Sequence, residues 1–223
     1  MGREVLRTKT FATEAANLIL VAAREAISQR NQFRIAISGG NTPRAVYSEM
    51  AKHDIPWEKF QFSFGDERCV PPTNEKSNFR MANEALFQPV SVPESSILRM
   101  RGEIDPPQGA DEYQGCLDAL AAKRDEKIYQ HDLILLGLGD DGHTASLFPD
   151  TEALLMTERR VAANYVPKLD SWRLTFTFSL IFAARAICFL IGANKDPKLI
   201  ERVFSGDVAF PAAHVDQNPK QVT

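Results

Sequence analysis

The stretch LILLGLGDDGHTASLFP at residues 133–149 joins a strongly apolar run to a polar turn. Its first six residues, 133–138, form a continuous apolar segment, which is typical of a parallel strand buried on both faces. Helices must then cover both sides of the sheet that contains it. The stretch therefore predicts an α/β fold in which a buried strand delivers Gly, Asp, His, Thr and Ser residues to one turn.

Strand and helix patterns alternate on both sides of this stretch. Further strands are predicted at residues 5–8, 33–38 (FRIAIS), 60–64, 174–178 and 186–191. Helices are predicted at residues 13–30, from Pro43 through Met50, and at residues 78–87, 110–127 and 197–204. This alternation predicts one domain over residues 1–223, with a Rossmann-like, three-layer α/β/α open sheet that is mostly parallel.

The composition indicates a globular protein, with 44% hydrophobic and 25% charged residues. A formal net charge of -3 provides no broad positive field for nucleic acid or an anionic membrane. An anionic ligand would therefore have to be held by local basic groups in a pocket. Neither a secretory signal nor an apolar run long enough to span a bilayer is recognisable, and Cys69, Cys116 and Cys188 are sparse. We therefore expect a cytoplasmic protein without nucleic-acid or membrane partners.

Four polar clusters follow the predicted strands, where ligands bind in open α/β sheets. The first, SGGNTP, follows residues 33–38. Gly39 and Gly40 allow close approach of the backbone to a ligand, and the helix N-terminus beyond them favours phosphate. Asn41 and Thr42 add hydrogen-bond donors. The alternative is an ordinary glycine-rich turn; the pattern matches neither GxxxxGK[ST] nor GxGxxG, so a nucleotide is not expected.

The turn after residues 133–138 contains the strongest catalytic candidates, His143 and Asp141. Histidine has a reference pKa of about 6.5 and can act as a general base near neutral pH. A nearby carboxylate can fix its tautomer and stabilise the imidazolium that forms. A helix-capping histidine is the alternative, but the crowding of polar residues in this turn favours chemistry.

Basic residues follow or begin three other predicted strands. Arg68, in the segment Gly65-Asp66-Glu67-Arg68, could hold a phosphate or an oxyanion with its planar fork, although a solvated loop is the alternative. Arg173 begins a predicted strand and Lys195 follows residues 186–191, and either could close an anion pocket. Surface lysines are common, so Lys195 alone is a weak signal.

Metal and covalent-serine chemistry are disfavoured by the residue patterns. The four histidines are scattered along the chain, with no HxxxH pair and no cysteines at ligand spacing. The GxSxG elbow of a serine hydrolase is absent. We therefore expect neither a metal site nor a covalent serine intermediate.

The segments SGGNTP, FGDERCVP with Ser77-Asn78 after it, LGLGDDGHTASLFP, RLTFTF and GANK resemble, in this order, the 6-phosphogluconolactonase family. The resemblance spans residues 33–211, and DGHTASLFP is its most specific block. It implies hydrolysis of 6-phospho-D-glucono-1,5-lactone to 6-phospho-D-gluconate in the oxidative pentose phosphate pathway, without a cofactor. The expected partner is this small phosphosugar lactone, and the expected state is a monomer or weak homo-oligomer.

The resemblance also implies roles for residues at matching positions. His143 would activate water and Asp141 would orient it; with Arg68 they are the expected catalytic residues. The expected substrate-binding residues are Gly39, Gly40, Asn41, Thr42, Arg173 and Lys195. The basic members of the site would hold phosphate and carboxylate-like oxygens, and the sequence does not divide these tasks among them.

Two departures from the family pattern accompany the resemblance. Phe182 stands before Ala183-Ala184, where family members often carry Asn, and this difference could alter the pocket. Family members also usually continue into a terminal strand and helix containing Trp, whereas this sequence stops at Thr223. Coverage of one edge of the sheet is therefore uncertain from sequence.

Two other functions fit parts of the pattern. A glucosamine-6-phosphate deaminase shares the fold, but its corresponding motifs resemble GxDGHIAFNEP and DEY, whereas this chain has DGHTASLFP and Asp66-Glu67-Arg68. A non-catalytic sugar-phosphate sensor is the second alternative, and the Phe182 departure keeps it open. Such sensor domains normally follow a helix-turn-helix segment, and the residues before Phe33 predict only a strand and one helix.

Overall fold

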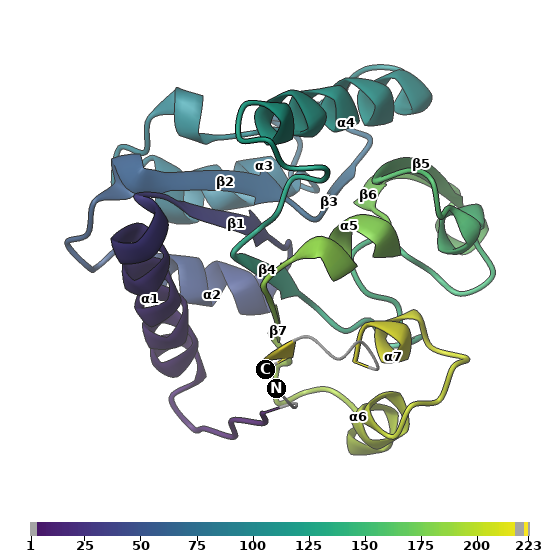
Figure 1. Cartoon of the computed structure of the whole chain (residues 1–223). Coiled ribbons are helices and arrows are strands. Elements are labelled where there is room, and N and C mark those ends of the chain that lie inside the picture. The colour runs from purple at the N-terminus through teal and green to yellow at the C-terminus, as the bar shows by residue number, and fades with distance from the viewer. Residues whose placement is uncertain (1–3, 217–220, 223) are drawn as a thin grey trace.

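The structure is a computed structural model that describes residues 4–216 and 221–222 (Figure 1). Its main sheet is parallel, with the strand order β2-β1-β4-β7-β8. These strands are β1 (Phe33–Ile37), β2 (Phe60–Phe64), β4 (Leu133–Leu136), β7 (Ala186–Phe189) and β8 (Gln221–Val222). A smaller antiparallel sheet has the order β3-β6-β5 and consists of β3 (Asp66–Arg68), β5 (Val161–Val166) and β6 (Ser171–Phe176).

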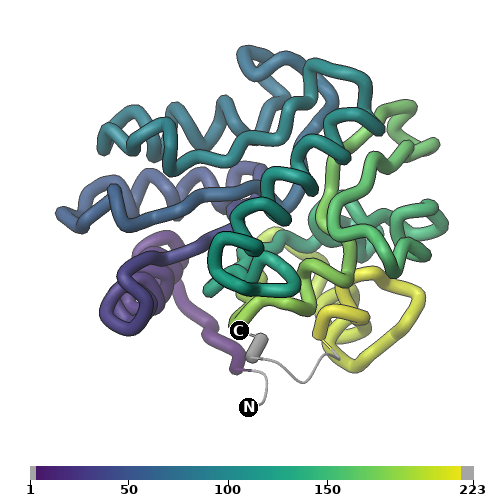
Figure 2. Tube along the Cα trace, turned by 45° about the horizontal axis from the view of Figure 1, so that its top comes forward, coloured from purple at the N-terminus to yellow at the C-terminus, as the bar shows by residue number. Residues whose placement is uncertain are grey.

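Helices cover both sheets. The α-helices are α1 (Phe11–Arg30), α2 (Asn41–Met50), α3 (Asn78–Ala82), α4 (Pro106–Ala122), α5 (Phe178–Ala183), α6 (Pro197–Phe204) and α7 (Pro211–Asp216). α3 continues as the π-helix η2 (Asn83–Phe87), and the short 3₁₀ helices are η1 (Trp57–Lys59), η3 (Glu94–Ser96), η4 (Glu152–Leu155) and η5 (Pro167–Leu169). α1 packs on α2 and β1. α4 packs on β5 and β6, which form the hairpin drawn in green in Figure 2.

The central strands are apolar because they are buried on both faces. Every residue of β1 and β4 is buried, and Ile35 of β1 lies in register with Phe62 of β2 and with Leu133 of β4. The ring of Phe62 packs against Phe87, with 5.0 Å between ring centroids. This burial confirms the predicted α/β class and the central position of the 133–138 run, although β4 itself ends at Leu136.

The chain passes from one sheet to the other at Gly65. Its N–H donates to the carbonyl of Ile37 in β1 over 3.0 Å, and its carbonyl accepts from the N–H of Phe176 in β6 over 2.8 Å. One residue therefore belongs to the hydrogen-bonding of both sheets. The consequence is that Arg68, only three residues further, lies in the antiparallel sheet.

Several predicted elements differ from the structure. Residues 5–8 are irregular and not a strand; Val5 and Leu6 are 64% and 55% exposed, so burial gives them no reason to join a sheet. The alternation at 174–178 stops early, because β6 ends at Phe176 and Phe178 starts α5. α2 begins at Asn41 and not at Pro43.

The helix predicted at residues 110–127 spans Pro106–Ala122 instead. The Asp105 side chain accepts the Gln108 N–H over 3.2 Å, and proline follows at the first helical positions, which sets the earlier start. At the other end of the chain, β8 pairs with β7, so this short strand lies at the sheet edge whose coverage the sequence left uncertain. Thr223 lies outside the described residues. Among the residues described, no helix is long and apolar enough to cross a membrane.

Candidate active site

The polar clusters gather at one edge of the parallel sheet because each follows a strand at its carboxyl end. The turn after β1 lies beside the turn after β7: a Cβ built on Gly192 would be 3.0 Å from Thr42 Oγ1. The turn after β7 in turn reaches the turn after β4, since Lys195 Nζ donates to Asp140 Oδ1 over 2.6 Å. Three of the four predicted clusters are therefore in direct contact with a neighbour.

His143 and Asp141 form a hydrogen-bonded pair after β4. The Nδ1 of His143 lies 2.5 Å from Asp141 Oδ1, and the same oxygen accepts the His143 backbone N–H over 3.3 Å. Because an ionised carboxylate only accepts, Nδ1 must carry a proton, and in the neutral imidazole this leaves the lone pair on Nε2. The side chain of His143 is 27% exposed. Nε2 is thus available to a ligand as a base.

The environment of Asp141 keeps it ionised. Partial burial opposes its ionisation, but hydrogen bonds from Lys168 and His143 outweigh that effect and lower the pKa of Asp141 to about 2. A carboxylate that stays anionic at neutral pH stabilises an imidazolium beside it. The pair therefore has the charge that general-base chemistry by His143 needs.

Gly142 and Phe148 hold the imidazole in place. Gly142 has φ +75°, a left-handed conformation in which residues with a side chain are strained, and a Cβ there would meet the ring of Phe210 at 2.2 Å. The ring of Phe148 stacks on His143 with centroids 3.9 Å apart and an interplanar angle of 22°. The glycine lets the chain turn, and the aromatic ring sets the plane of the imidazole.

A buried polar network joins the turns after β1, β2 and β4. Asp66 Oδ2 accepts from the Ser146 hydroxyl over 2.6 Å, and Asn78 Nδ2 donates to the Asp66 carbonyl over 2.9 Å. The Asn78 side chain lies against Gly39. Sequence analysis assigned no role to Asp66 or Ser146; their position beside Arg68 and His143 in the recognised segments was the signal that could have found them.

Glu67 anchors the start of α3. Its carboxylate accepts hydrogen bonds from the Ser77 hydroxyl and from the backbone N–H groups of Arg68, Asn78 and Phe79, at 2.7–3.0 Å. Burial raises the pKa of Glu67, and the three backbone hydrogen bonds oppose that rise. Glu67 as a whole is 2% exposed. Its role in the structure is therefore to hold the segment that carries Asn78.

Arg68 and Arg173 lie directly opposite each other in β3 and β6. Burial and the neighbouring charge of Arg68 lower the pKa of Arg173. The hydrogen bonds described for both guanidinium groups go to neutral oxygens: from Arg68 to the Lys76 carbonyl at 2.5 Å, and from Arg173 to the Ser171 hydroxyl at 2.8 Å. Two adjacent cations of this kind favour an anionic ligand. Lys195 differs, because its charge is paired with Asp140.

The remaining predicted residues form the start of α2. Gly40 is the N-cap of this helix, with φ +103° and no side-chain capping bond, and Asn41 is the first helical residue. The first N–H groups of a helix without a side-chain cap can donate to an anion. Contact of Gly40, Asn41 and Thr42 with a substrate stays a prediction.

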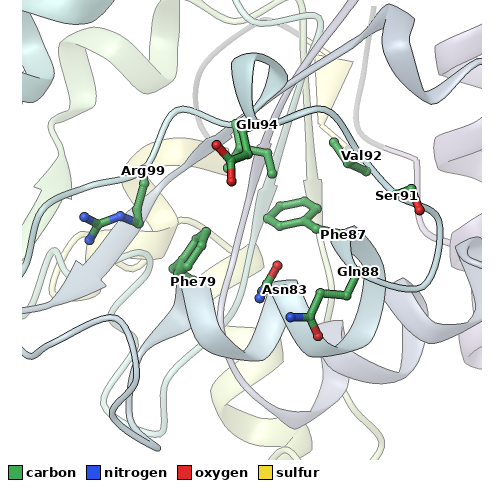
Figure 3. Close-up of a pocket in the computed structure, with 9 residues that line it drawn as sticks. Phe79, Asn83, Phe87, Gln88, Ser91, Val92, Glu94 and Arg99 are labelled. Atoms are coloured by element: carbon green, nitrogen blue, oxygen red, sulfur yellow. The ribbon is translucent and has the colours of Figure 1, made fainter.

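Two hollows lie elsewhere on the surface. The first, about 600 Å³ in volume, is lined by residues of α3, η2 and the segment that follows, among them Phe79, Phe87 and Arg99 (Figure 3). The second, about 570 Å³, includes Cys69 and Trp172 in its lining. Neither is lined by His143, so a substrate cavity at the imidazole stays a prediction.

Possible metal ligands do not cluster. Within residues 4–216 and 221–222, no group of three or more His, Cys, Asp or Glu side chains is placed to hold a metal ion. Phe182, the departure noted in the sequence, stacks on Phe178 in α5 with ring centroids 5.5 Å apart. It packs there against the hydrophobic core.

Known proteins share both this sequence and this fold. Residues 7–223 match the family described as glucosamine-6-phosphate isomerases/6-phosphogluconolactonase. The chain belongs to this family. Over 220 residues it is 41% identical to a 6-phosphogluconolactonase of Synechocystis sp., covering 97% of this chain and 88% of that protein. A 6-phosphogluconolactonase of Nostoc sp. is 37% identical, with 95% and 90% covered.

Solved structures agree with this family membership. A 6-phosphogluconolactonase from Trypanosoma brucei superposes with a TM-score of 0.83 at 26% identity, covering 99% of this chain and 94% of that one. The crystal structure of devB protein gives a TM-score of 0.86 at 27% identity, with 99% of this chain and 94% of that one covered. The resemblance and the fold class predicted from the sequence are therefore confirmed.

Proposed function

We propose that this protein hydrolyses 6-phospho-D-glucono-1,5-lactone to 6-phospho-D-gluconate, the lactonase step of the oxidative pentose phosphate pathway. The observation that carries the proposal is the His143–Asp141 pair, whose geometry leaves Nε2 of His143 as a free base at the carboxyl edge of the sheet. The names of the family members reported above support the substrate. The paired cations Arg68 and Arg173 match its negative charge.

In the proposed mechanism, His143 Nε2 removes a proton from water while the water oxygen bonds to the lactone carbonyl carbon. The carbonyl electrons move to its oxygen, and Asp141 stabilises the imidazolium that forms. The carbonyl then re-forms as the bond between its carbon and the ring oxygen breaks, and His143 returns the proton to that oxygen. A lactone is already electrophilic, so positioning and charge suffice and no metal is needed.

The basic residues supply the electrostatic part of this mechanism. Arg68 and Arg173 would bind the phosphate, because a guanidinium presents two parallel N–H groups to phosphate oxygens. Lys195, held beside the turn by Asp140 over 2.6 Å, and the N-terminus of α2 would face the remaining oxygens of the substrate. We assign phosphate to the two arginines because their described hydrogen bonds include none to a carboxylate, whereas the charge of Lys195 is already paired with Asp140.

The test is acid release from lactone that glucose-6-phosphate dehydrogenase makes in the same cuvette, measured above the spontaneous rate. We expect the wild type to accelerate acid release. His143→Gln should lower the catalysed rate at least about 100-fold, the usual contribution of a general base. His53→Gln, in the turn after α2, is the matched control and should behave as wild type. Binding of 6-phosphogluconate should persist in His143→Gln.

Two outcomes would reject the proposal. Binding of 6-phosphogluconate without any acceleration by the wild type would indicate a sugar-phosphate sensor. Ammonia release from glucosamine 6-phosphate, with the lactone untouched, would indicate a deaminase.

A further inference from the structure

Lys168 reaches the His143–Asp141 pair from a separate part of the chain. It lies in η5 (Pro167–Leu169), the connection between β5 and β6. Its Nζ pairs with Asp141 Oδ2, whereas the other carboxylate oxygen, Oδ1, accepts from His143. The Asp141 carboxylate is therefore held at both oxygens. Lys168, 27 positions further along the chain, holds Oδ2, and His143, two positions further, holds Oδ1.

Lys168 also approaches the other neighbour of the imidazole. Its Nζ lies over the Phe148 ring, 6.0 Å from the centroid, and that ring stacks on His143. A cation at this distance from an aromatic face is attracted to it. Lys168 thus contacts both groups that set the orientation of His143, the carboxylate and the stacked ring.

We infer that Lys168 is a positioning residue for His143, a role that rests on the proposed lactonase function. It holds the Asp141 carboxylate in the rotation that points Oδ1 at Nδ1, and thereby keeps the Nδ1–H tautomer with a free Nε2. A carboxylate bound at one oxygen only can turn about its terminal bond, which has a broad torsional minimum. Lys168 removes this freedom.

The role is one of geometry more than of charge. The Lys168 side chain is 60% exposed, and exposed ion pairs contribute little through charge alone. Asp140 also lies near the pair, and its charge is neutralised by Lys195 at 2.6 Å. Removing the ammonium should therefore disorder the carboxylate without greatly changing the field at the substrate.

The kinetic test compares Lys168→Met with Lys52→Met in the lactone assay. Lys52, in the turn after α2, also forms an exposed ion pair with a carboxylate: its Nζ lies 2.6 Å from Glu49 Oε2. It therefore controls for loss of an exposed pair. We expect Lys168→Met to lower kcat about 10-fold with KM within about twofold, since misplacing a catalytic group slows the chemical step. Lys168→Arg should recover most of kcat, and Lys52→Met should equal wild type.

A spectroscopic test does not depend on turnover. The imidazole ¹⁵N signals of His143, assigned by their loss in His143→Gln, report which nitrogen carries the proton. We expect the Nδ1–H form to dominate in wild type and Lys52→Met at pH 9, and to lose population in Lys168→Met. This effect in a protein without lactonase activity would reject the proposed function and leave the positioning role intact.

Three results would overturn the inference. An unchanged tautomer population in Lys168→Met would do so whatever the activity. So would an unchanged kcat in an active enzyme. A rise in KM at constant kcat would assign Lys168 to binding of the substrate anion instead.

Discussion

Asn78 lies directly against Gly39: a Cβ built on Gly39 would be 1.8 Å from Asn78 Oδ1. Asn78 cannot easily move aside, because its Nδ2 donates to the carbonyl of Asp66 over 2.9 Å and the residue is 1% exposed. The glycine turn after β1 and the start of α3 are thus fitted to each other. Any side chain at position 39 must displace a buried hydrogen-bonded amide.

We therefore expect Gly39→Ala to lower the free energy of unfolding by about 1–3 kcal/mol, the usual range for overpacking a buried site. Lactonase activity should fall with it, since the turn that precedes α2 moves. Gly115→Ala in α4 is the control: a Cβ there meets nothing within 4 Å, so the variant should gain about 0.5–1 kcal/mol from helix propensity. Urea unfolding measures both, and equal shifts for the two variants would contradict the steric argument.

Most of the parallel sheet could be predicted from sequence, because β1, β4 and β7 are apolar at almost every position and β2 has phenylalanine at every second position. The run at 133–138 and the alternation of Phe60, Phe62 and Phe64 come from burial against helices, which leaves a local pattern. The antiparallel sheet leaves no such pattern in β3 (Asp66–Arg68), whose three charged residues resemble a solvated loop. Its pairing with β6 depends on residues more than 100 positions away.

The same distinction applies to the site. His143 and Asp141 are two positions apart, so their pairing is a local property of the turn and was predictable. Ser146 and Asp66 are 80 positions apart, and Lys168 meets Asp141 only because the β5–β6 hairpin folds back toward the turn after β4. Single-sequence patterns carry no information about contacts that the tertiary fold creates.

Arg68→Ala should weaken binding of the phosphorylated substrate. A hydrogen bond to a charged group contributes about 1.5–3 kcal/mol, so we expect KM to rise about 10- to 100-fold with a smaller change in kcat. Arg101→Ala is the control, since Arg101 makes a surface ion pair with Glu112 at 2.9 Å and is half exposed. If Arg68→Ala kept the wild-type KM, the assignment of Arg68 to the anion site would be wrong.

Glu67→Gln should destabilise the fold, because its two carboxylate oxygens accept four hydrogen bonds in a buried position. The NH₂ group of Gln would then point a donor at a donor, such as a backbone N–H, in place of an acceptor. We expect the free energy of unfolding to fall by about 2–3 kcal/mol. Glu84→Gln, an exposed residue that pairs with Arg80 at 2.8 Å, should change stability by less than about 0.5 kcal/mol. Chemical denaturation of the two variants decides between them, and a similar small loss in both would refute the anchoring role of Glu67.

Acid should remove the stabilisation that Asp141 contributes. Its pKa is about 2 in the folded protein, below the ordinary value of 3.8, so this stability is present above pH 3.8 and is lost as the pH falls toward 2. The stability difference between wild type and Asp141→Asn should therefore shrink by about 1 kcal/mol over that interval, a value reduced for solvent screening. Unfolding free energies measured at pH 5 and pH 2.5 check this, and parallel curves for the two proteins would show that the pair does not stabilise the fold.

Removal of divalent metals should leave the hydrolysis rate unchanged. The Nδ1 of His143 is engaged by Asp141, and no other His, Cys, Asp or Glu pair in residues 4–216 completes a ligand set around it. In the proposed mechanism the imidazole of His143 activates the attacking water, and its basicity does not depend on a metal. Enzyme dialysed against EDTA should match untreated enzyme in the coupled assay, and added Zn²⁺ or Mg²⁺ should not increase its rate. Strong inhibition by the chelator that a metal then reverses would show that a metal ion takes part in the reaction.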